Sequence, residues 1–216
     1  MNHLIKKSLP TDAEKFIEIK NRLSLKSQNQ NTSTTGGFLL GTDLETYRFF
    51  IRNCYCLSCE VNNNFVGFGI VLPDNILKST ELWQKRNYVK LDFDLKEIEN
   101  SNIIYFDQLA FLKGYSKLAL ATAYNLVKPA FENGAQYLLT TTVNKPVTNL
   151  AAVPFILNSG GKKIGSIDEH YPEVGSIVSD IYLLKADSFL ENVKKSVFFP
   201  FLKSCEIKNL FTKTAE

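Results

Sequence analysis

The stretch IIYFDQLAFLKGYSKLALATAYNLV, residues 103–127, contains two successive hydrophobic patterns. Its first nine residues are mostly apolar or aromatic, which is typical of a buried strand. After a short turn, apolar residues recur at spacings of three and four, and they predict a helix over residues 116–133 with one buried stripe. The stretch therefore predicts a strand that leads through a short turn into a helix.

The start of this predicted helix is a candidate anion site. The first N–H groups of a helix have no partner within it, and they carry a partial positive charge that suits a pyrophosphate. Lys113 and Lys117 would add positive charge, and the small side chains of Ala119 and Ala121 would leave room beside the backbone. An alanine-rich helix that simply packs on a sheet has the same pattern, so both interpretations remain open at this point.

Further predicted elements lie on both sides of this stretch. Capping boxes that begin at Thr11 and Thr42 predict two helix starts, and the asparagines at 62–64 predict the turn of a hairpin. The other strands are expected at 3–9, 55–61, 65–72, 136–143, 162–167 and 176–184, and a short helix at 148–158. This order predicts one α/β (α+β) domain over residues 1–185, with a mixed sheet.

Three segments lie outside this regular pattern. The polar stretch 28–37 is expected to be a loop. The charged insertion 73–101 contains Trp83, which either lines a substrate wall or packs against the sheet. Residues 186–216 are expected to form a C-terminal helical tail that packs on the domain or at the seam of a homodimer. Docking of this tail to a membrane is the weaker alternative, because Pro200 interrupts its amphipathic face.

The composition is that of a folded globular chain. Of 216 residues, 44% are hydrophobic and 22% are charged, which argues against disorder, collagen and a coiled coil. A net charge of +3 is too balanced to indicate a nucleic-acid or membrane partner. The sequence shows no signal peptide and no 18-residue apolar run, so we expect a cytoplasmic protein.

The four cysteines are expected to be free thiols rather than disulfides. Cys54, Cys56 and Cys59 lie close together, but in a strand the first two share one face and the third points to the other. A zinc site would need a fourth ligand, and neither histidine is near in sequence. We therefore favour small buried strand residues over a metal site, and expect no metal.

Two motif blocks together resemble the GNAT superfamily of N-acetyltransferases. DQLAF at 107–111, followed by a short connection and a helix, is similar to the acyl-CoA-binding motif of that family, although Ser116, Ala119 and Ala121 make it a degenerate match. TTVNKPVTNLAAVPFILNSGGKKIG at 141–165 is similar to the next family block, with Asn149, Ala152, Phe155 and Gly160 at the family spacing. GGFLLG and VSDIYLL extend the resemblance over residues 4–184.

This resemblance implies a GNAT-type fold, in which a mixed, largely antiparallel central sheet is flanked by helices. It also implies direct transfer of an acetyl group from acetyl-CoA to a primary amine. The pantetheine arm would lie in a splay between the strand that ends at Phe111 and the strand at 136–143, and backbone N–H groups would bind it and polarise the thioester carbonyl. The residues implied to bind the cofactor are Leu109, Ala110, Phe111, Ser116, Lys117, Leu118, Ala119, Leu120, Ala121, Thr122, Asn149 and Phe155.

The catalytic residues are less well defined. Asp107 is the candidate general base, and strand alternation places its side chain on the same face as Leu109 and Phe111; a purely structural role for the carboxylate is the alternative. The family often has Tyr or His after the position of Phe155, but here Ile156 cannot exchange a proton. Tyr171 and Tyr182 are the candidates to replace it as general acid.

Two other functions remain open from the sequence. A non-catalytic acyl-CoA-binding or regulatory protein of the same fold would explain Ile156 and the lost motif glycines. An idle interaction domain would use the insertion and the tail to bind a protein partner. The acceptor amine, the acyl-chain length and the oligomeric state are not encoded in any recognisable motif, because acceptor pockets are built from variable loops.

Overall fold

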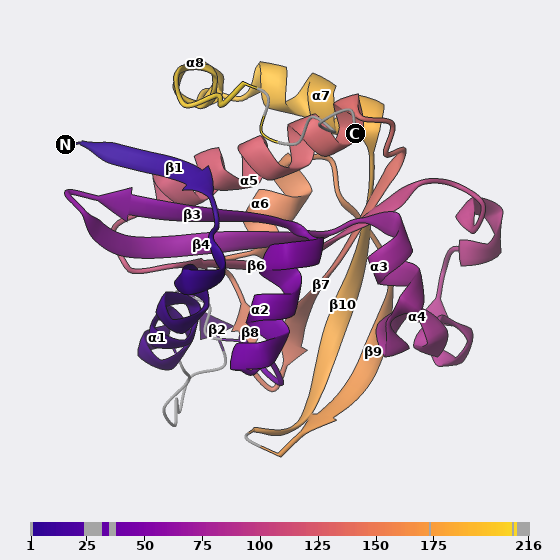
Figure 1. Cartoon of the computed structure of the whole chain (residues 1–216). Coiled ribbons are helices and arrows are strands. Elements are labelled where there is room, and N and C mark those ends of the chain that lie inside the picture. The colour runs from indigo at the N-terminus through magenta and orange to yellow at the C-terminus, as the bar shows by residue number, and fades with distance from the viewer. Residues whose placement is uncertain (1, 24–31, 35–37, 173, 209, 211–216) are drawn as a thin grey trace.

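An eight-stranded mixed sheet forms the centre of the computed structural model (Figure 1). The structure describes residues 2–23, 32–34, 38–172, 174–208 and 210. In spatial order the strands are β1 (His3–Lys7), β3 (Tyr55–Val61), β4 (Asn64–Leu72), β6 (Ile103–Phe111), β7 (Tyr137–Lys145), β10 (Gly175–Lys185), β9 (Lys162–Tyr171) and β5 (Lys90–Leu91). Every neighbouring pair in this sheet is antiparallel except β6 and β7, which are parallel. The predicted mixed, largely antiparallel fold class is therefore confirmed.

Helices cover both faces of the sheet and define two cores. One core, the α5-side core, lies under α5 (Ser116–Glu132), α6 (Val153–Asn158), α7 (Ala186–Lys195) and α8 (Phe199–Ser204). The other, the α1-side core, lies under α1 (Ala13–Leu23), α2 (Leu44–Asn53), α3 (Asp74–Ser79) and α4 (Glu81–Gln84). Alternation along each strand sends successive side chains into opposite cores, as in β3, where Cys56 joins the α1-side core and Cys59 the α5-side core.

The helix starts differ in detail from the capping boxes expected at Thr11 and Thr42. A 3₁₀ turn, Pro10–Asp12, precedes α1, and the Asp12 carboxylate accepts from the Leu9 N–H and from the Ser58 hydroxyl, each over 3.0 Å. Asp43, rather than Thr42, is the N-cap of α2, because its carboxylate accepts from the Thr46 N–H over 2.8 Å. Asn62 and Asn63 adopt positive φ angles in the predicted hairpin turn between β3 and β4.

The insertion 73–101 contributes more regular structure than expected. It contains α3, α4, two 3₁₀ turns (Lys85–Tyr88 and Leu95–Ile98) and β5, which adds an edge strand to β9. The Trp83 ring is buried in the α1-side core, and the Arg86 guanidinium lies 4.6 Å from its centroid. Trp83 therefore packs as a core residue, which is the alternative that the sequence left open.

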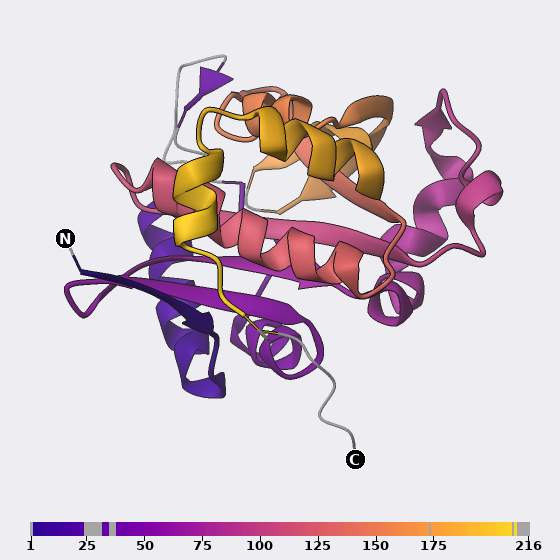
Figure 2. The ribbon, with the colours of Figure 1, turned by 90° about the horizontal axis from the view of Figure 1, so that it is seen from above.

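The C-terminal helices pack on the domain, with α8 against α5 (Figure 2). Asn125 of α5, 1% exposed, fastens the chain that follows α8: its amide donates to the Cys205 carbonyl over 3.0 Å, and its oxygen accepts from the Ile207 N–H over 2.8 Å. Glu206 adds an ion pair with Lys128. The tail therefore covers one side of α5 within a single chain.

The three clustered cysteines are buried, and burial raises the pKa of the Cys54 and Cys59 thiols to about 12. Among the described residues, no group of three or more His, Cys, Asp or Glu side chains could hold a metal ion. Within the same ranges, no helix has the length and apolarity needed to cross a membrane. The polar stretch 28–37 lies largely outside the described residues; its residues Thr32 and Ser33 form a short strand, β2 (Thr32–Ser33), paired with β8 (Thr148–Asn149).

Gly67 on β4 is expected to tolerate no side chain. A Cβ atom there would lie 2.5 Å from the Ala110 carbonyl oxygen and from the ring of Phe111 on β6. Because a backbone carbonyl cannot move aside cheaply, Gly67→Ala should lower the free energy of unfolding by about 2 kcal/mol. Urea unfolding followed by circular dichroism would measure this difference between the variant and wild type. A Gly67→Ala variant as stable as wild type would contradict the β4–β6 packing.

Candidate active site

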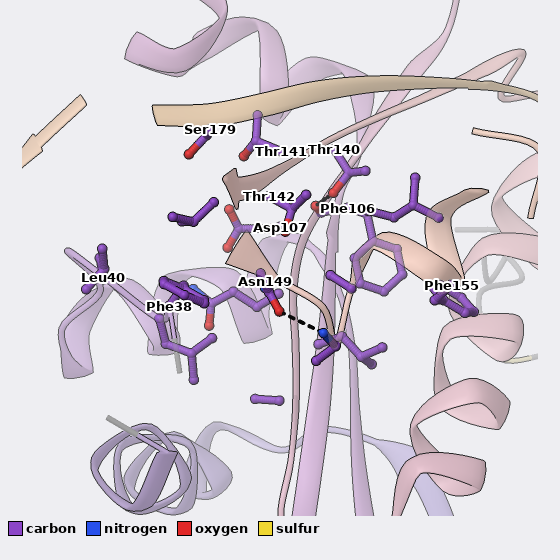
Figure 3. A pocket seen from close by; sticks show the side chains of 18 of the residues that line it. Phe38, Leu40, Phe106, Asp107, Thr140, Thr141, Thr142, Asn149, Phe155 and Ser179 are labelled. Atoms are coloured by element: carbon purple, nitrogen blue, oxygen red, sulfur yellow. Dashed lines mark hydrogen bonds between the residues drawn. The ribbon is translucent and has the colours of Figure 1, made fainter. Parts of the chain in front are cut away.

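The parallel strands β6 and β7 separate halfway along their length. They pair from Ile103↔Tyr137 to Phe106↔Thr140, and no further pair follows. Beyond this point β6 remains paired with β4, and β7 with β10. The gap opens into a cavity of about 850 Å³, which extends from the start of α5 to the α1 side of the sheet (Figure 3). The splay implied by the GNAT resemblance is thus present in this chain.

Two backbone N–H groups of β6 face this gap. The Leu112 N–H donates to the Val66 carbonyl on β4 over 2.9 Å. Since N–H groups alternate along a strand, that of Ala110 also points to β4, whereas those of Leu109 and Phe111 point into the splay. The expected donors Leu109, Ala110 and Phe111 all line the cavity, but only the first and the last offer an N–H to a ligand there.

Asp107 lies on a β-bulge at the point of separation. On β4, Ile70 pairs with Gln108 and the next residue, Val71, pairs with Phe106, so Asp107 has no partner on that strand. The bulge shifts the alternation by one residue: Phe106, Leu109 and Phe111 belong to the α5 side, whereas Gln108 and Ala110 face the α1 side. The expectation that Asp107 shares a face with Leu109 and Phe111 is therefore wrong.

The Asp107 carboxyl points to the α1 side of the cavity (Figure 3). Its negative charge helps to raise the pKa of Tyr47, Tyr105 and Cys54, which all belong to the α1-side core. Burial raises the pKa of Asp107 itself to about 6, against a hydrogen bond from Gln108 that lowers it. A carboxyl group with this pKa changes its protonation state near neutral pH, as a general base does.

A second carboxylate lies on the same side of the cavity and was not anticipated from the sequence. Glu169 on β9 accepts hydrogen bonds from the Tyr171 hydroxyl over 3.0 Å and from the Ser179 hydroxyl over 3.1 Å. The negative charges of Glu169 and Asp107 both help to raise the pKa of the Tyr105 phenol. The Tyr105 hydroxyl lies 2.7 Å from the Thr141 hydroxyl. The signal was missed because β9 was expected to end at residue 167, and it extends to Tyr171.

The candidate general acids lie in different places. Tyr171 lines the cavity, where its hydroxyl binds Glu169 and its ring would meet a Cβ at Gly41. Tyr182 is buried in the α5-side core and is not among the residues that line the cavity in the described ranges. The structure does not bring Tyr182 to this site.

The Gln108 side chain on β6 is hydrogen-bonded to the loop at residues 38–42, which closes the α1 side of the cavity. Its side-chain oxygen accepts from the buried Tyr47 hydroxyl over 2.9 Å, and its amide donates to Thr42 Oγ1 over 3.0 Å. Thr42 follows Phe38 and Leu40, which form an apolar wall of the cavity (Figure 3). This chain of hydrogen bonds fixes the loop relative to Asp107.

The start of α5 supplies free N–H groups at the other end of the cavity. Tyr115 is the N-cap and offers no side-chain hydrogen bond, so the N–H groups of Ser116, Lys117 and Leu118 have no partner within the helix. The Ala119 N–H donates to the Tyr115 carbonyl over 3.0 Å, and those of Leu120, Ala121 and Thr122 follow inside the helix. Of the residues implied to bind the cofactor, those from Ala119 to Thr122 therefore have no free N–H group to offer a pyrophosphate.

The side chains of this helix divide between cavity and core. Ser116, Ala119 and Leu120 line the cavity. Lys117 is exposed, whereas Leu118, Ala121 and Thr122 are buried and do not line the cavity in the described ranges. Leu118 can therefore take part only through its N–H group, whereas Lys117 offers both its N–H group and an exposed ammonium side chain. Ala121 and Thr122 are no longer candidates.

Asn149 and Phe155 complete the α5 side of the cavity (Figure 3). The Asn149 oxygen accepts from the Ala151 N–H over 3.2 Å, which leaves its amide N–H₂ to donate elsewhere. Pro154 is at the first turn of α6, where a missing N–H group costs nothing. Ile156 is 6% exposed and belongs to the α5-side core.

Comparison with known proteins identifies the fold. The sequence matches no family model and no curated protein significantly. The structure is similar to that of a Streptococcus pneumoniae acetyltransferase of the GNAT family, with 18% identity, a TM-score of 0.51, and 85% of this chain and 99% of that chain covered. It is similar to the ribosomal-protein-S18-alanine N-acetyltransferase of Escherichia coli, with 14% identity, a TM-score of 0.56, and 86% and 94% covered.

A third similar structure is that of yncA from Salmonella typhimurium, which was solved with its cofactor acetyl-CoA. The identity is 12%, the TM-score is 0.57, and 87% of this chain and 95% of that chain are covered. At these identities the likeness concerns the fold. Together with the splayed parallel pair and the helix start beside it, these matches show that the chain has the GNAT fold.

Proposed function

We propose that this protein transfers an acetyl group from acetyl-CoA to a primary amine of a small molecule or a protein. The observation that carries the proposal is the continuous cavity that joins the free N–H groups at the start of α5, the splay between β6 and β7, and the half-buried Asp107. An anion site, a slot for an extended arm and a carboxylate lie along it in that order.

The residues present fit acetyl-CoA on the α5 side. The N–H groups of Ser116, Lys117 and Leu118 would hold the pyrophosphate. The Phe111 N–H group and the Asn149 amide would pair with the pantetheine arm, and the apolar ring of Phe155 would lie beside it. When bound, acetyl-CoA supplies an activated acyl carbonyl to the far end of the splay.

The residues on the α1 side fit a cationic acceptor. Only the neutral amine attacks a carbonyl, so an ammonium group must first lose a proton. Asp107, with its pKa near 6, takes that proton directly or through water. The Leu109 N–H donates to the carbonyl oxygen as negative charge develops there. Glu169, fixed by Tyr171 and Ser179, adds negative potential that attracts the ammonium form.

The proposal is tested first by calorimetric titration with acetyl-CoA. We expect a dissociation constant in the micromolar range, about tenfold weaker for Asn149→Ala, since that change removes one amide donor to the arm. Asn53→Ala, which changes an exposed asparagine at the end of α2 outside the described cavity lining, is the matched control and should bind like wild type. A thiol-release assay over a panel of primary amines then tests transfer. Absence of binding at millimolar acetyl-CoA would contradict the proposal.

A non-catalytic acyl-CoA-binding protein of the same fold is the second candidate. The buried Ile156 favours it, because the family position for a proton-donating side chain here is a core residue. Tight binding of acetyl-CoA without thiol release for any amine in the panel would support this second function instead.

A further inference from the structure

Three consecutive threonines, Thr140, Thr141 and Thr142, occupy β7 where it separates from β6 (Figure 3). The Thr140 hydroxyl donates to the Phe106 carbonyl over 2.9 Å, and the Thr141 hydroxyl lies 2.7 Å from the Tyr105 hydroxyl. Thr142 is 5% exposed, and within the described part of the chain its hydroxyl has no hydrogen-bond partner. Buried hydroxyl groups are normally paired, so a ligand in the cavity that Thr142 lines is the natural partner.

Strand pairing places Thr142 on the α5 side of the sheet. It pairs with Asp180 on β10, and Thr140 pairs with Tyr182, which belongs to the α5-side core. Residues two apart on a strand share a face, so the Thr142 side chain points to the same side as Tyr182. Ile156 of α6 belongs to that core as well. Thr142 and Ile156 therefore face the same side of the cavity.

The register gives the height of Thr142 along the splay. Counting on from the last pair, Phe106↔Thr140, Thr142 is level with Gln108, directly beside the bulge at Asp107. The start of α5 follows Phe111, at the opposite end of the splay. A ligand with its pyrophosphate at α5 would thus bring its thioester end, and not its nucleotide end, to Thr142.

We propose that the Thr142 hydroxyl donates a hydrogen bond to the sulfur of the acyl donor and stabilises the thiolate as it leaves, in place of a side chain at position 156. This inference rests on the proposed function. Once Asp107 has passed the first ammonium proton to water, the lone pair of the neutral amine forms the C–N bond, the C–S bond breaks with its electron pair on sulfur, and the remaining surplus proton on nitrogen goes to Asp107. Thr142 keeps its own proton, because an alcohol is a far weaker acid than a thiol.

The test measures the thiol pKa of bound CoA by the ultraviolet absorbance of its thiolate, and so needs no acceptor. Removing the hydrogen bond with the isosteric Thr142→Val should raise that pKa by about one unit, which is a tenfold lower thiolate fraction at a fixed pH. Thr142→Ser should restore the wild-type value. Affinity for CoA in its thiol form should change by less than about threefold, and with an acceptor kcat should fall about tenfold at unchanged KM.

Thr122→Val is the matched control. The Thr122 hydroxyl is also buried and without a partner in the described ranges, but it lies in α5 and does not line the cavity. This variant should leave the thiol pKa unchanged. An unchanged thiol pKa in Thr142→Val, with CoA bound, would overturn this inference and leave the proposed function intact. Absence of CoA binding by wild type would overturn both.

Discussion

Replacing Asp107 with asparagine is expected to lower the rate of acetyl transfer at pH 7.5 by about 100-fold. A general base typically raises the rate by about 10²- to 10⁴-fold, and water can replace part of this effect in the variant. Affinity for acetyl-CoA should remain within about twofold, since the Asp107 carboxyl faces the α1 side of the cavity, away from the free N–H groups of α5. Steady-state kinetics and calorimetry on the same preparations would separate the two effects.

The pH dependence of wild type should report the same group. Burial raises the pKa of Asp107 to about 6, so kcat/KM should rise with pH through that value as the carboxyl loses its proton. In Asp107→Asn this limb should disappear. If the variant kept both the wild-type rate and the rise near pH 6, another group would be the base.

The pH dependence of the free energy of unfolding offers an independent check. Its sign is opposite to the one expected for a salt-bridged aspartate. Between pH 3.8 and 6 the unfolded chain has lost the Asp107 proton while the folded chain keeps it, so the stability contributed by this group falls as pH rises through that window. Above pH 6 the folded protein carries the full cost of a buried charge, about 2 to 3 kcal/mol. Asp107→Asn should therefore unfold at a higher temperature than wild type at pH 7.5, and at the same temperature near pH 3.

Introducing a negative charge at the start of α5 should weaken acetyl-CoA binding by about 10- to 100-fold. Ser116→Asp places a carboxylate at the first residue of the helix, where Ser116 lines the cavity beside the unpaired N–H groups. The carboxylate would compete for those N–H groups and repel the pyrophosphate. Calorimetric titration at two salt concentrations would measure the loss, which should shrink as salt screens the repulsion.

The same substitution should not harm the fold. An acidic side chain in the first turn stabilises a helix by about 0.3 to 1 kcal/mol through its dipole, so Ser116→Asp should unfold at or slightly above the wild-type temperature. Ser116→Asn, neutral and similar in size, is the control and should bind acetyl-CoA nearly as wild type does. Equal affinities for wild type and Ser116→Asp would place the pyrophosphate away from α5.

The sequence predicts the strands and helices of this fold well where hydrophobic periodicity is strong. The strand at 103–111 and the helix from 116 are present with nearly the expected bounds, because their buried stripes dominate local preference. The helix starts expected at Thr11 and Thr42 are less accurate. At each of them the carboxylate of the next residue, an aspartate, accepts a hydrogen bond from a backbone N–H group in place of the threonine hydroxyl. The strand β5 has only two residues and no periodic signal of its own.

The site was predictable only in outline. The splay and the helix start follow from the motif blocks, but the face of Asp107 depends on a bulge, and a one-residue irregularity in pairing has no signature in the sequence of one strand. Glu169 and Thr142 become visible only when β9, β10 and β7 are set side by side, because partners across a sheet are remote in sequence. Tyr182 was chosen by its position in the chain, and its strand face takes it into the core.

The separation of β6 and β7 divides the sheet into two halves of four strands each, joined by four residue pairs. Backbone amides at the middle of a sheet normally exchange their hydrogens slowly, because both neighbours protect them. Here Leu109 and Phe111 are interior positions whose amides face the gap. These two amides should exchange quickly with solvent deuterium, whereas their neighbours exchange slowly. Exchange at both should slow when a ligand fills the gap and bonds to both halves of the sheet.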